Sequence, residues 1–269
     1  MLKAVADRTF EPTRSVLDEV GNMMILTGRT IVSAVRPPYP YGSEFVGQFL
    51  FAIRLCWFPL LISTIAFGYE APGLQGANFL VLFGAIDRLG GFFVLSSVRE
   101  FAPFVDAIVL AGVAGTAITA DLGARKIREE LEALQVLGVD PIKNLVVPRF
   151  LALMLVTGLF DVYALIFGVI GGIMATLVNH APLGPFFATF FNNAETTDLW
   201  GSVVKTTLFG AIIAIVCCYK GMTASGGAEG VGRAVNQAVV IAFLGVFAFN
   251  YAFTQTLLAT HPEITTIIK

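Results

Sequence analysis

Five long apolar stretches restrict the fold of this chain more than any other feature of its sequence. Each is close to the roughly 20 residues that an α-helix needs to cross the hydrocarbon core of a bilayer. Composition agrees, since 56% of the 269 residues are hydrophobic and only 13% are charged, against roughly 25% charged residues in a soluble domain. We therefore predict an all-α integral membrane protein. The expected spans lie at 45–69 and 101–120 and within 145–178, 199–219 and 234–258.

An amphipathic segment precedes the first span. Between Arg14 and Arg36, apolar residues recur near helical spacing with charged residues between them, a pattern typical of a helix that lies in the membrane interface. Prolines at 37, 38 and 40 end this pattern. We assign residues 1–40 to this interfacial helix and residues 41–269 to the transmembrane domain, and we recognise no signal peptide at the start of the chain.

Charged residues interrupt the apolar sequence at several points. Asp87, Arg88, Arg99 and Glu100 divide the segment 77–100, which we expect to form a broken or hairpin-like helix leading into the second span. Two further acids, at 106 and 161, fall within predicted spans, where hydrogen bonding inside the protein is expected because an unpaired charge is costly in lipid. Arg54 and Lys205 are expected to extend toward the nearer membrane surface.

Lysine and arginine alternate between the connecting segments. The N-terminal segment and the segment 122–149 contain five each and 220–233 contains two, whereas 70–98 and 179–198 contain only Arg88. Because positive residues concentrate in cytoplasmic loops, we predict a cytoplasmic N-terminus, cytoplasmic segments at 122–149 and 220–233, and a C-terminus outside the cell. The protein is thus expected to cross the cell membrane several times.

One cytoplasmic segment reads as a complete amphipathic helix over about 124–138. Asp121 can cap its start, Gly138 can end it in a left-handed conformation, and Asp140 with Pro141 can begin the next helix. An apolar set is expected on one face and a charged set on the other, as for a helix that docks into a partner. The apolar set is Ile127, Leu131, Leu134 and Leu137, and the polar set is Arg125, Arg128, Glu129, Glu132 and Gln135.

Small residues four positions apart predict close helix contacts in the membrane. The pairs are Gly168 with Gly172, Gly171 with Ala175, Ala111 with Gly115, and Gly112 with Thr116.

Several function classes are disfavoured. The formal net charge of −2 gives no reason to expect a nucleic-acid partner. Cys56, Cys217 and Cys218 lie in apolar runs and are read as small buried residues. No P-loop is present, so ATP hydrolysis by this chain is not expected. We also expect no catalytic residue and no metal site.

Several motifs, in order, carry a resemblance to a known family. The strongest are VREFAP at 98–103, AGVAGTA at 111–117, ADLG at 120–123, EELEALQVLGVDP at 129–141 and VVPR at 146–149. The chain resembles the MlaE/YrbE family of permeases, the membrane subunits of Mce-associated ABC lipid transporters, over essentially its whole length. The sequences at 121–125, 218–221, 226–227 and 230–232 look most like the actinobacterial YrbE A-type subunits.

The resemblance implies an interfacial elbow helix plus five spans, paired with a second permease, a B-type paralogue. The pair would work on a dimer of cytoplasmic ABC ATPases, which bind ATP and magnesium, while this chain binds no cofactor. An MCE-protein assembly would lie outside the cell. The segment 124–138 would be the coupling helix, with its glutamates on basic groups of the ATPase and its leucines in an apolar cleft. The implied coupling residues are Ile127, Glu129, Glu130, Leu131, Glu132, Leu134, Leu137, Gly138 and Asp140.

The same resemblance suggests a lipid path at Arg99 and Glu100, with Phe93 nearby. An internal ion pair that fixes the broken helix is the alternative for Arg99 and Glu100. The expected function is ATP-driven movement of a phospholipid, fatty or mycolic acid, or sterol between MCE proteins and the membrane. An ion or proton channel and a structural anchor for MCE proteins remain alternatives, whereas a lipid-modifying enzyme would need converging catalytic groups that the sequence does not supply.

Overall fold

The computed structural model describes residues 2–262, and within this range its regular structure is entirely helical. Five helical segments are long and apolar enough to cross a membrane, which confirms the predicted fold class. They are Gly42–Leu82, Ile86–Ile127, Ile142–Val178, Thr196–Met222 and Gly227–Thr260. The residues before 2 and after 262, with the expected extracellular C-terminus, lie outside the described residues.

The spans are built from shorter elements, some of them wide π-helical turns. The first contains α2 (Gly42–Gly68), η1 (Tyr69–Gln75) and α3 (Gly76–Leu82). The second contains η2 (Ile86–Arg88), α4 (Leu89–Phe93), η3 (Val94–Phe101), α5 (Ala102–Leu110), η4 (Ala111–Gly115) and α6 (Thr116–Ile127). After α7 (Glu130–Val136), the third contains η5 (Ile142–Val146) and α8 (Val147–Val178), and α10 (Thr196–Met222) and α11 (Gly227–Thr260) form the last two.

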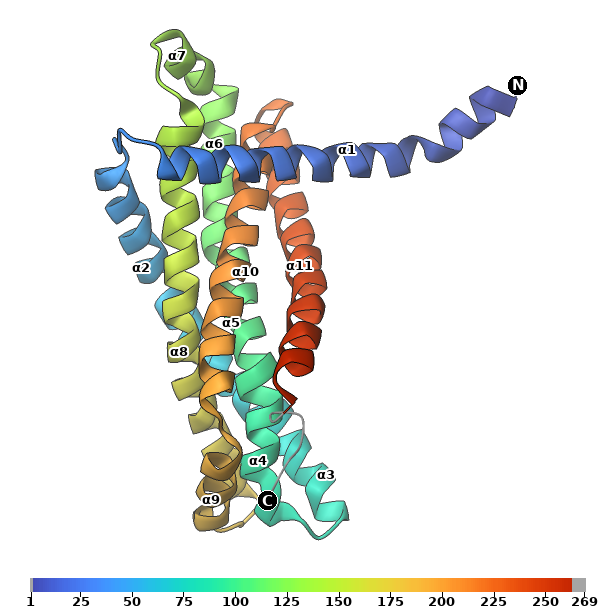
Figure 1. Ribbon diagram of the computed structural model, residues 1–269, viewed down its shortest axis with the longest axis vertical. Coiled ribbons are helices and arrows are strands. Elements are labelled where there is room, and N and C mark those ends of the chain that lie inside the picture. Colours follow the sequence, from blue (N-terminus) through green and yellow to red (C-terminus); the bar gives the residue numbers. More distant parts are fainter. Residues whose placement is uncertain (1, 263–269) are drawn as a thin grey trace.

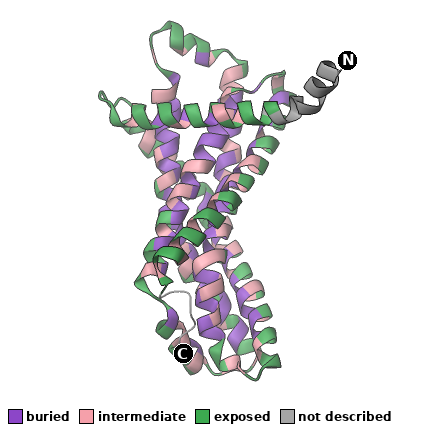
Figure 2. Cartoon of the chain, turned by 45° about the vertical axis from the view of Figure 1, so that its right-hand side comes forward, coloured by how far each residue is buried: buried purple, intermediate pink, exposed green. Residues whose placement is uncertain are grey.

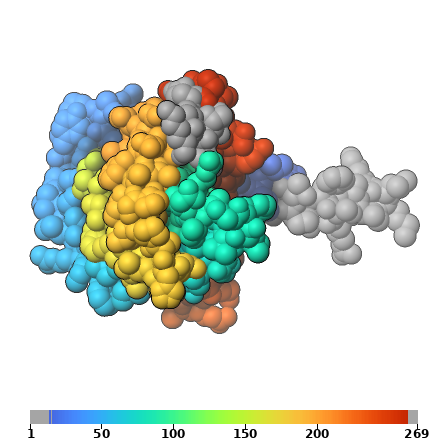
Figure 3. Space-filling view, turned by 90° about the horizontal axis from the view of Figure 1, so that it is seen from below, coloured from blue at the N-terminus to red at the C-terminus, as the bar shows by residue number. Residues whose placement is uncertain are grey.

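The first two spans extend beyond their predicted limits and meet in a hairpin. The chain turns at residues 83–85, where Gly84 adopts a φ of 64° that suits glycine. The predicted hairpin within 77–100 is therefore present, but each of its arms continues a spanning helix. At this end the short helix α9 (Leu183–Asn193), which was not predicted, packs on α4. Figure 3 views this end, with α9 in gold and the α4 region in teal.

A long helix, α1 (Leu2–Val35), lies across the opposite end of the bundle, roughly at right angles to the spans (Figure 1). It includes the predicted amphipathic segment. One face is buried at Met23, Leu26 and Thr30. Glu19 forms an ion pair with Lys220 of α10. These contacts, and the perpendicular orientation, fit a helix that rests on the membrane surface.

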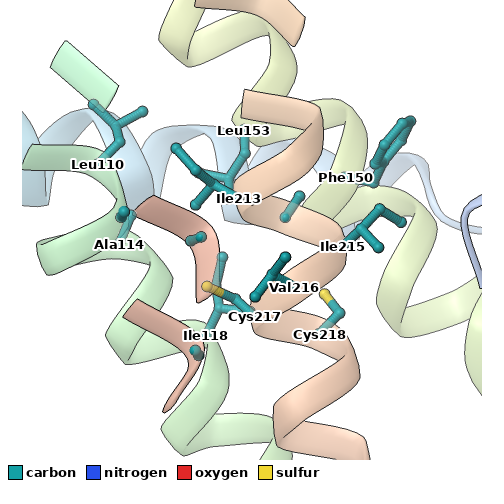
Figure 4. Packing of buried hydrophobic residues seen from close by; sticks show 14 of the residues in the cluster. Leu110, Ala114, Ile118, Phe150, Leu153, Ile213, Ile215, Val216, Cys217 and Cys218 are labelled. Atoms are coloured by element: carbon teal, nitrogen blue, oxygen red, sulfur yellow. The ribbon is translucent and has the colours of Figure 1, made fainter. Parts of the chain in front are cut away.

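The main core lies between the second, third and fourth spans, and Figure 2 shows buried residues along the height of the bundle. Leu110, Ala114 and Ile118 of the second span face Ile213 and Cys217 of α10 (Figure 4). The first and last spans are more peripheral, since only 22% of the most apolar window of each is buried, against 67% for α10. Much of their apolar surface is therefore available to lipid or to another chain.

Glycines let α2 and α8 approach to backbone contact. A Cβ atom at Gly171 would lie 2.4 Å from the Ile65 carbonyl oxygen, and one at Gly172 would lie 2.6 Å from the Phe93 ring. A Cβ at Gly115 would meet Cys217 Sγ at 2.8 Å, whereas Gly112 has open space around it. The predicted close contacts are confirmed at the first three positions, and the prediction for Gly112 is wrong.

Candidate functional site

A bent helical segment projects beyond α1 at one end of the bundle (Figure 1). α6 runs straight out of the membrane region to Ile127, and the chain then bends where Glu129 adopts a left-handed φ of 59°. After this bend α7 covers only Glu130–Val136, and Gly138, with φ 76°, ends it. The single helix predicted over 124–138 is therefore wrong, although its predicted end at Gly138 is confirmed. Asp121 does not cap a helix, because the spanning helix simply continues through it.

The bend redistributes the apolar side chains of this segment. Leu131 is only 4% exposed and packs, with Leu134 beside it, against the main core of the chain itself. Val136 and Leu137 are 88% and 76% exposed, and Ile127 is also exposed. The predicted apolar stripe is thus split, because Leu131 and Leu134 face inward while Leu137 faces outward.

Two of the three glutamates in this segment pair with neighbouring cations. Arg128 donates to Glu130 across 2.6 Å, and Lys126 donates to Glu132. The Lys126 hydrogen bond lowers the pKa of the Glu132 carboxyl, and the hydrogen bond to Glu130 raises the pKa of Arg128. Glu129 is exposed and forms no ion pair with any residue of 14–262. It is the glutamate most available to a partner.

The segment returns to the bundle through the predicted turn at Asp140. Its carboxylate accepts a hydrogen bond from the Ile142 backbone N–H at 2.9 Å, which satisfies a free donor at the start of the third span. The prediction that Asp140 and Pro141 begin the next helix is confirmed.

A buried arginine, which sequence reasoning left without a role, lies at the base of the projecting segment. Arg149 donates to Asp121 of α6 at 2.7 Å and to the Leu145 carbonyl at 2.8 Å, and Glu44 of α2 lies 3.6 Å away. Arg149 therefore connects three spans at the end where α7 projects. The sequence feature that could have pointed to Arg149 is its position in the VVPR motif at 146–149.

A second charged cluster lies toward the other end of the bundle, where Arg99 and Glu100 of η3 point to different partners. Arg99 pairs with Asp198 of α10 at 2.6 Å. The Glu100 carboxylate accepts hydrogen bonds from Asn250 at 2.8 Å and Thr254 at 2.9 Å, both on α11. The alternative prediction was an internal ion pair that fixes the broken helix. Arg99 and Glu100 do have internal partners, but these partners lie on other helices, and the two residues do not pair with each other.

Two predictions about lone charges need correction. Lys205 does not extend to the surface: it is 3% exposed, donates to the Arg99 carbonyl and lies 3.7 Å from Glu100. Asp161 accepts a hydrogen bond from Ser202 at 3.0 Å as expected, but neither carboxyl oxygen of Asp106 has a hydrogen-bond partner among the described residues. Both corrections have one cause: helix packing sets which side chains meet.

Phe93 lies apart from this cluster. It is fully buried in a small second core with Ala77, Leu89 and Phe186, and its ring centroid is 5.9 Å from that of Phe186. The structure therefore brings together two of the three predicted path residues and places Phe93 in the packing between α4 and α9.

The polar partners of Arg99 and Glu100 were missed by sequence reasoning, though weak signals existed. Asp198 lies three positions after Glu195, and the two residues form a capping box at the start of α10. Asn250 and Thr254 are four residues apart in α11, and that spacing puts both on the face that meets Glu100.

A helical bundle with five candidate spans, an interfacial helix and a segment that projects on one side defines the chain as a multi-pass membrane protein. Sequence comparison gives the class as a permease, because residues 45–256 match the family model described as Permease MlaE. The chain therefore belongs to the MlaE permease family.

Individual relatives agree. A probable ABC transporter permease protein of Rickettsia typhi is 31% identical over 96% of this chain and 99% of its own length. Another from Synechocystis sp. is 37% identical over 66% of this chain and 68% of its own. The intermembrane phospholipid transport system permease protein MlaE of Haemophilus influenzae is 29% identical over 72% of this chain and 75% of its own.

Proposed function

We propose that this chain is the transmembrane subunit of an ATP-driven lipid transporter. Membership in the MlaE permease family and similarity to the H. influenzae phospholipid permease support a lipid as the substrate. A phospholipid is the leading candidate on that ground, and fatty or mycolic acids and sterols are the other lipid classes that we consider. The finer assignment to the YrbE A-type subunits rests on the four short motifs alone.

The exposed apolar end of α7 is the observation that carries the proposed dependence on an ATPase. Val136 and Leu137 are almost fully exposed on a segment that projects past the interfacial helix α1. Apolar side chains beyond the membrane surface face water, where their exposure is unfavourable unless a protein covers them. Nearby Glu129, which forms no ion pair within residues 14–262, adds a negative charge. An ATPase that binds α7 would cover the apolar pair and place a basic group opposite Glu129.

Movement of α7 on ATPase binding would be transmitted directly to the membrane spans. α6 continues without interruption from the second span to Ile127, and Arg149 ties its Asp121 to α8. A push on α7 by closing ATPases would therefore act on the second and third spans together. This route replaces docking through Leu131 and Leu134, because those side chains pack within the chain.

The proposed assembly follows the same orientation. α1, α7 and the lysine- and arginine-rich segments lie at one end of the bundle, which we assign to the cytoplasm. A second permease, a B-type paralogue, would cover apolar surface on the peripheral first and last spans. MCE proteins would meet the other end, where α9 and the α3–α4 hairpin lie. The Arg99 and Glu100 cluster would contact the polar part of the lipid.

The proposed function is tested by isolating the chain from its native membrane under mild conditions. Mass spectrometry of the purified complex should identify an ABC ATPase, a second permease, MCE proteins and an enriched lipid class. Isolation of the chain without any ATPase, together with ion or proton flux through the purified chain alone, would instead identify a channel.

A further inference from the structure

Asp106 occupies an unusual position for an aspartate. It lies in α5, in the middle of the second span, and its exposed fraction is 0%. Neither carboxyl oxygen has a hydrogen-bond partner among the described residues. Ionisable residues inside membrane spans are costly and are retained mostly where they serve a function. The roles proposed above for α7 and for Arg99 with Glu100 make no use of Asp106.

Among the described residues, no cation forms an ion pair with Asp106. α2 contributes the Cys56 thiol and α8 contributes Asp161, whose negative charge acts on Asp106. Asp161 is itself fully buried, and within the part of the chain that the structure describes one of its oxygens accepts a hydrogen bond from Ser202 of α10 while the other has no partner. Lys205, a buried cation of α10, donates to the Arg99 carbonyl, lies 3.7 Å from Glu100 and interacts electrostatically with Asp161. Arg99 of η3 pairs with Asp198.

An ionised Asp106 would thus be a carboxylate without donors, away from water and close to a second acid. Burial without compensation and a neighbouring like charge both favour the neutral form of a carboxyl group. We propose that Asp106 and Asp161 form a proton-binding site in the core of the membrane domain, with a proton on Asp106 in this packed arrangement.

The site links proton binding to helix packing. Asp106, Asp161 and Ser202 lie on α5, α8 and α10, so separation of these helices would admit water and let Asp106 ionise. Proton release then accompanies opening, and low pH favours the packed arrangement. The Asp106→Asn variant, which cannot ionise, should keep the packed arrangement independent of pH.

Infrared spectroscopy of the purified permease complex in lipid nanodiscs tests the proposal. The neutral carboxyl and the carboxylate have separate C=O stretching bands. At pH 7 the unmodified protein should show a carboxylic-acid band that is missing from the spectrum of Asp106→Asn. A lost carboxylate band would overturn the proposal. Glu100→Gln is the matched control and should remove carboxylate bands, because Glu100 accepts two hydrogen bonds and lies near Lys205.

A second measurement needs no variant. Dicyclohexylcarbodiimide adds to protonated carboxyls in apolar surroundings, and mass spectrometry should locate the adduct on Asp106 but not on Asp198. Modification of Asp198 in preference to Asp106 at pH 6 would contradict the proposal. Replacement of sodium by choline should leave the Asp106 infrared band unchanged, whereas a shift of that band would mean that a metal cation and not a proton occupies the site.

Discussion

Arg149 and Asp121 form an ion pair of 2.7 Å between α8 and α6, and the arginine side chain is 1% exposed. Arg149 is buried in the third span, where a positive charge is costly unless it is paired. The Asp121 carboxylate compensates for this placement and holds the base of the projecting segment against the third span.

The first prediction concerns this pair. Asp121→Asn would remove the nearer carboxylate of the buried Arg149 and leave the more distant Glu44 carboxylate, 3.6 Å away. Removing one partner of a buried pair costs about 3–5 kcal/mol, and we expect about 2 kcal/mol here because Asp121 is half-exposed. The thermal unfolding temperature of the detergent-solubilised protein should fall accordingly. Asp121→Glu is the control, and its unfolding temperature should fall less. Equal stability of Asp121→Asn and the unmodified protein would contradict this role.

The second prediction uses two glycines as a matched pair. Gly171→Ala would place a Cβ 2.4 Å from the Ile65 carbonyl oxygen and push α2 away from α8, at a cost of about 1–3 kcal/mol. Gly112→Ala meets nothing within 4 Å and should leave stability unchanged or slightly improved. Thermal unfolding of the two variants in the same detergent measures the difference. Similar loss in both would mean that the α2–α8 contact is looser than the structure has it.

The third prediction concerns the docking face of α7. Leu137→Asp changes an exposed side chain, so the permease should insert and fold normally while binding of the ATPase falls at least tenfold. Leu131→Asp places a charge in the chain's own core and should reduce folding first. Pull-down of the ATPase after a folding check by size-exclusion chromatography separates the two effects. Full ATPase binding by Leu137→Asp would remove α7 from the interface.

Glu129 supplies a milder variant of the same test. Glu129→Lys should weaken ATPase binding less than Leu137→Asp does, and the loss should shrink at high salt, because exposed charges at the edge of an interface are screened. Binding measured across a salt series gives the answer. A loss that does not vary with salt would argue against a charged contact.

The fourth prediction concerns orientation. Cysteines introduced at Asn192 and Ser225 would both be exposed, whereas Asn193 is buried and unsuitable. A membrane-impermeant maleimide should label the first in intact cells and the second only after the membrane is opened. The three native cysteines are buried and should react little. The reverse labelling pattern would place α7 outside the cell and exclude an ATPase there.

The fifth prediction concerns the charged cluster. Glu100→Gln should lower lipid transport while assembly continues, if the carboxylate contacts the lipid. Asp198→Asn removes the partner of Arg99 and weakens the capping box of α10, so assembly itself should suffer. Transport in reconstituted vesicles and complex yield are the two readouts. Loss of assembly with Glu100→Gln would show that its bonds to α11 are structural.

The sequence predicted the spans well, because apolar runs of bilayer length depend only on local composition. It did less well where the chain leaves the membrane. The bend at Glu129 could not be foreseen, since glutamate is not a residue that favours a left-handed φ. Without that bend, the apolar residues of 124–138 were assigned to one face, and Leu131 was assigned to a partner instead of to the chain's own core.

The partners in the charged cluster could not be predicted for a different reason. Arg99 and Asp198 are 99 residues apart, and no local pattern states which helices become neighbours. The sequence indicated that charges at membrane depth need partners, but the partners depend on the packing of η3, α10 and α11. The π-helical turns added to the difficulty, because they shift the helical period within the second span.

These wide turns also have a mechanical consequence. η3 and η4 flank α5, so the nine-residue helix that contains Asp106 lies between two π-helical segments. Each of these segments holds more residues per turn than an α-helix does. If the extra residue of one π-helical segment shifted to the other, α5 would rotate by about 100°, the angle between successive residues of an α-helix. α4 and α6 could then keep their positions while the side chains of α5 changed neighbours.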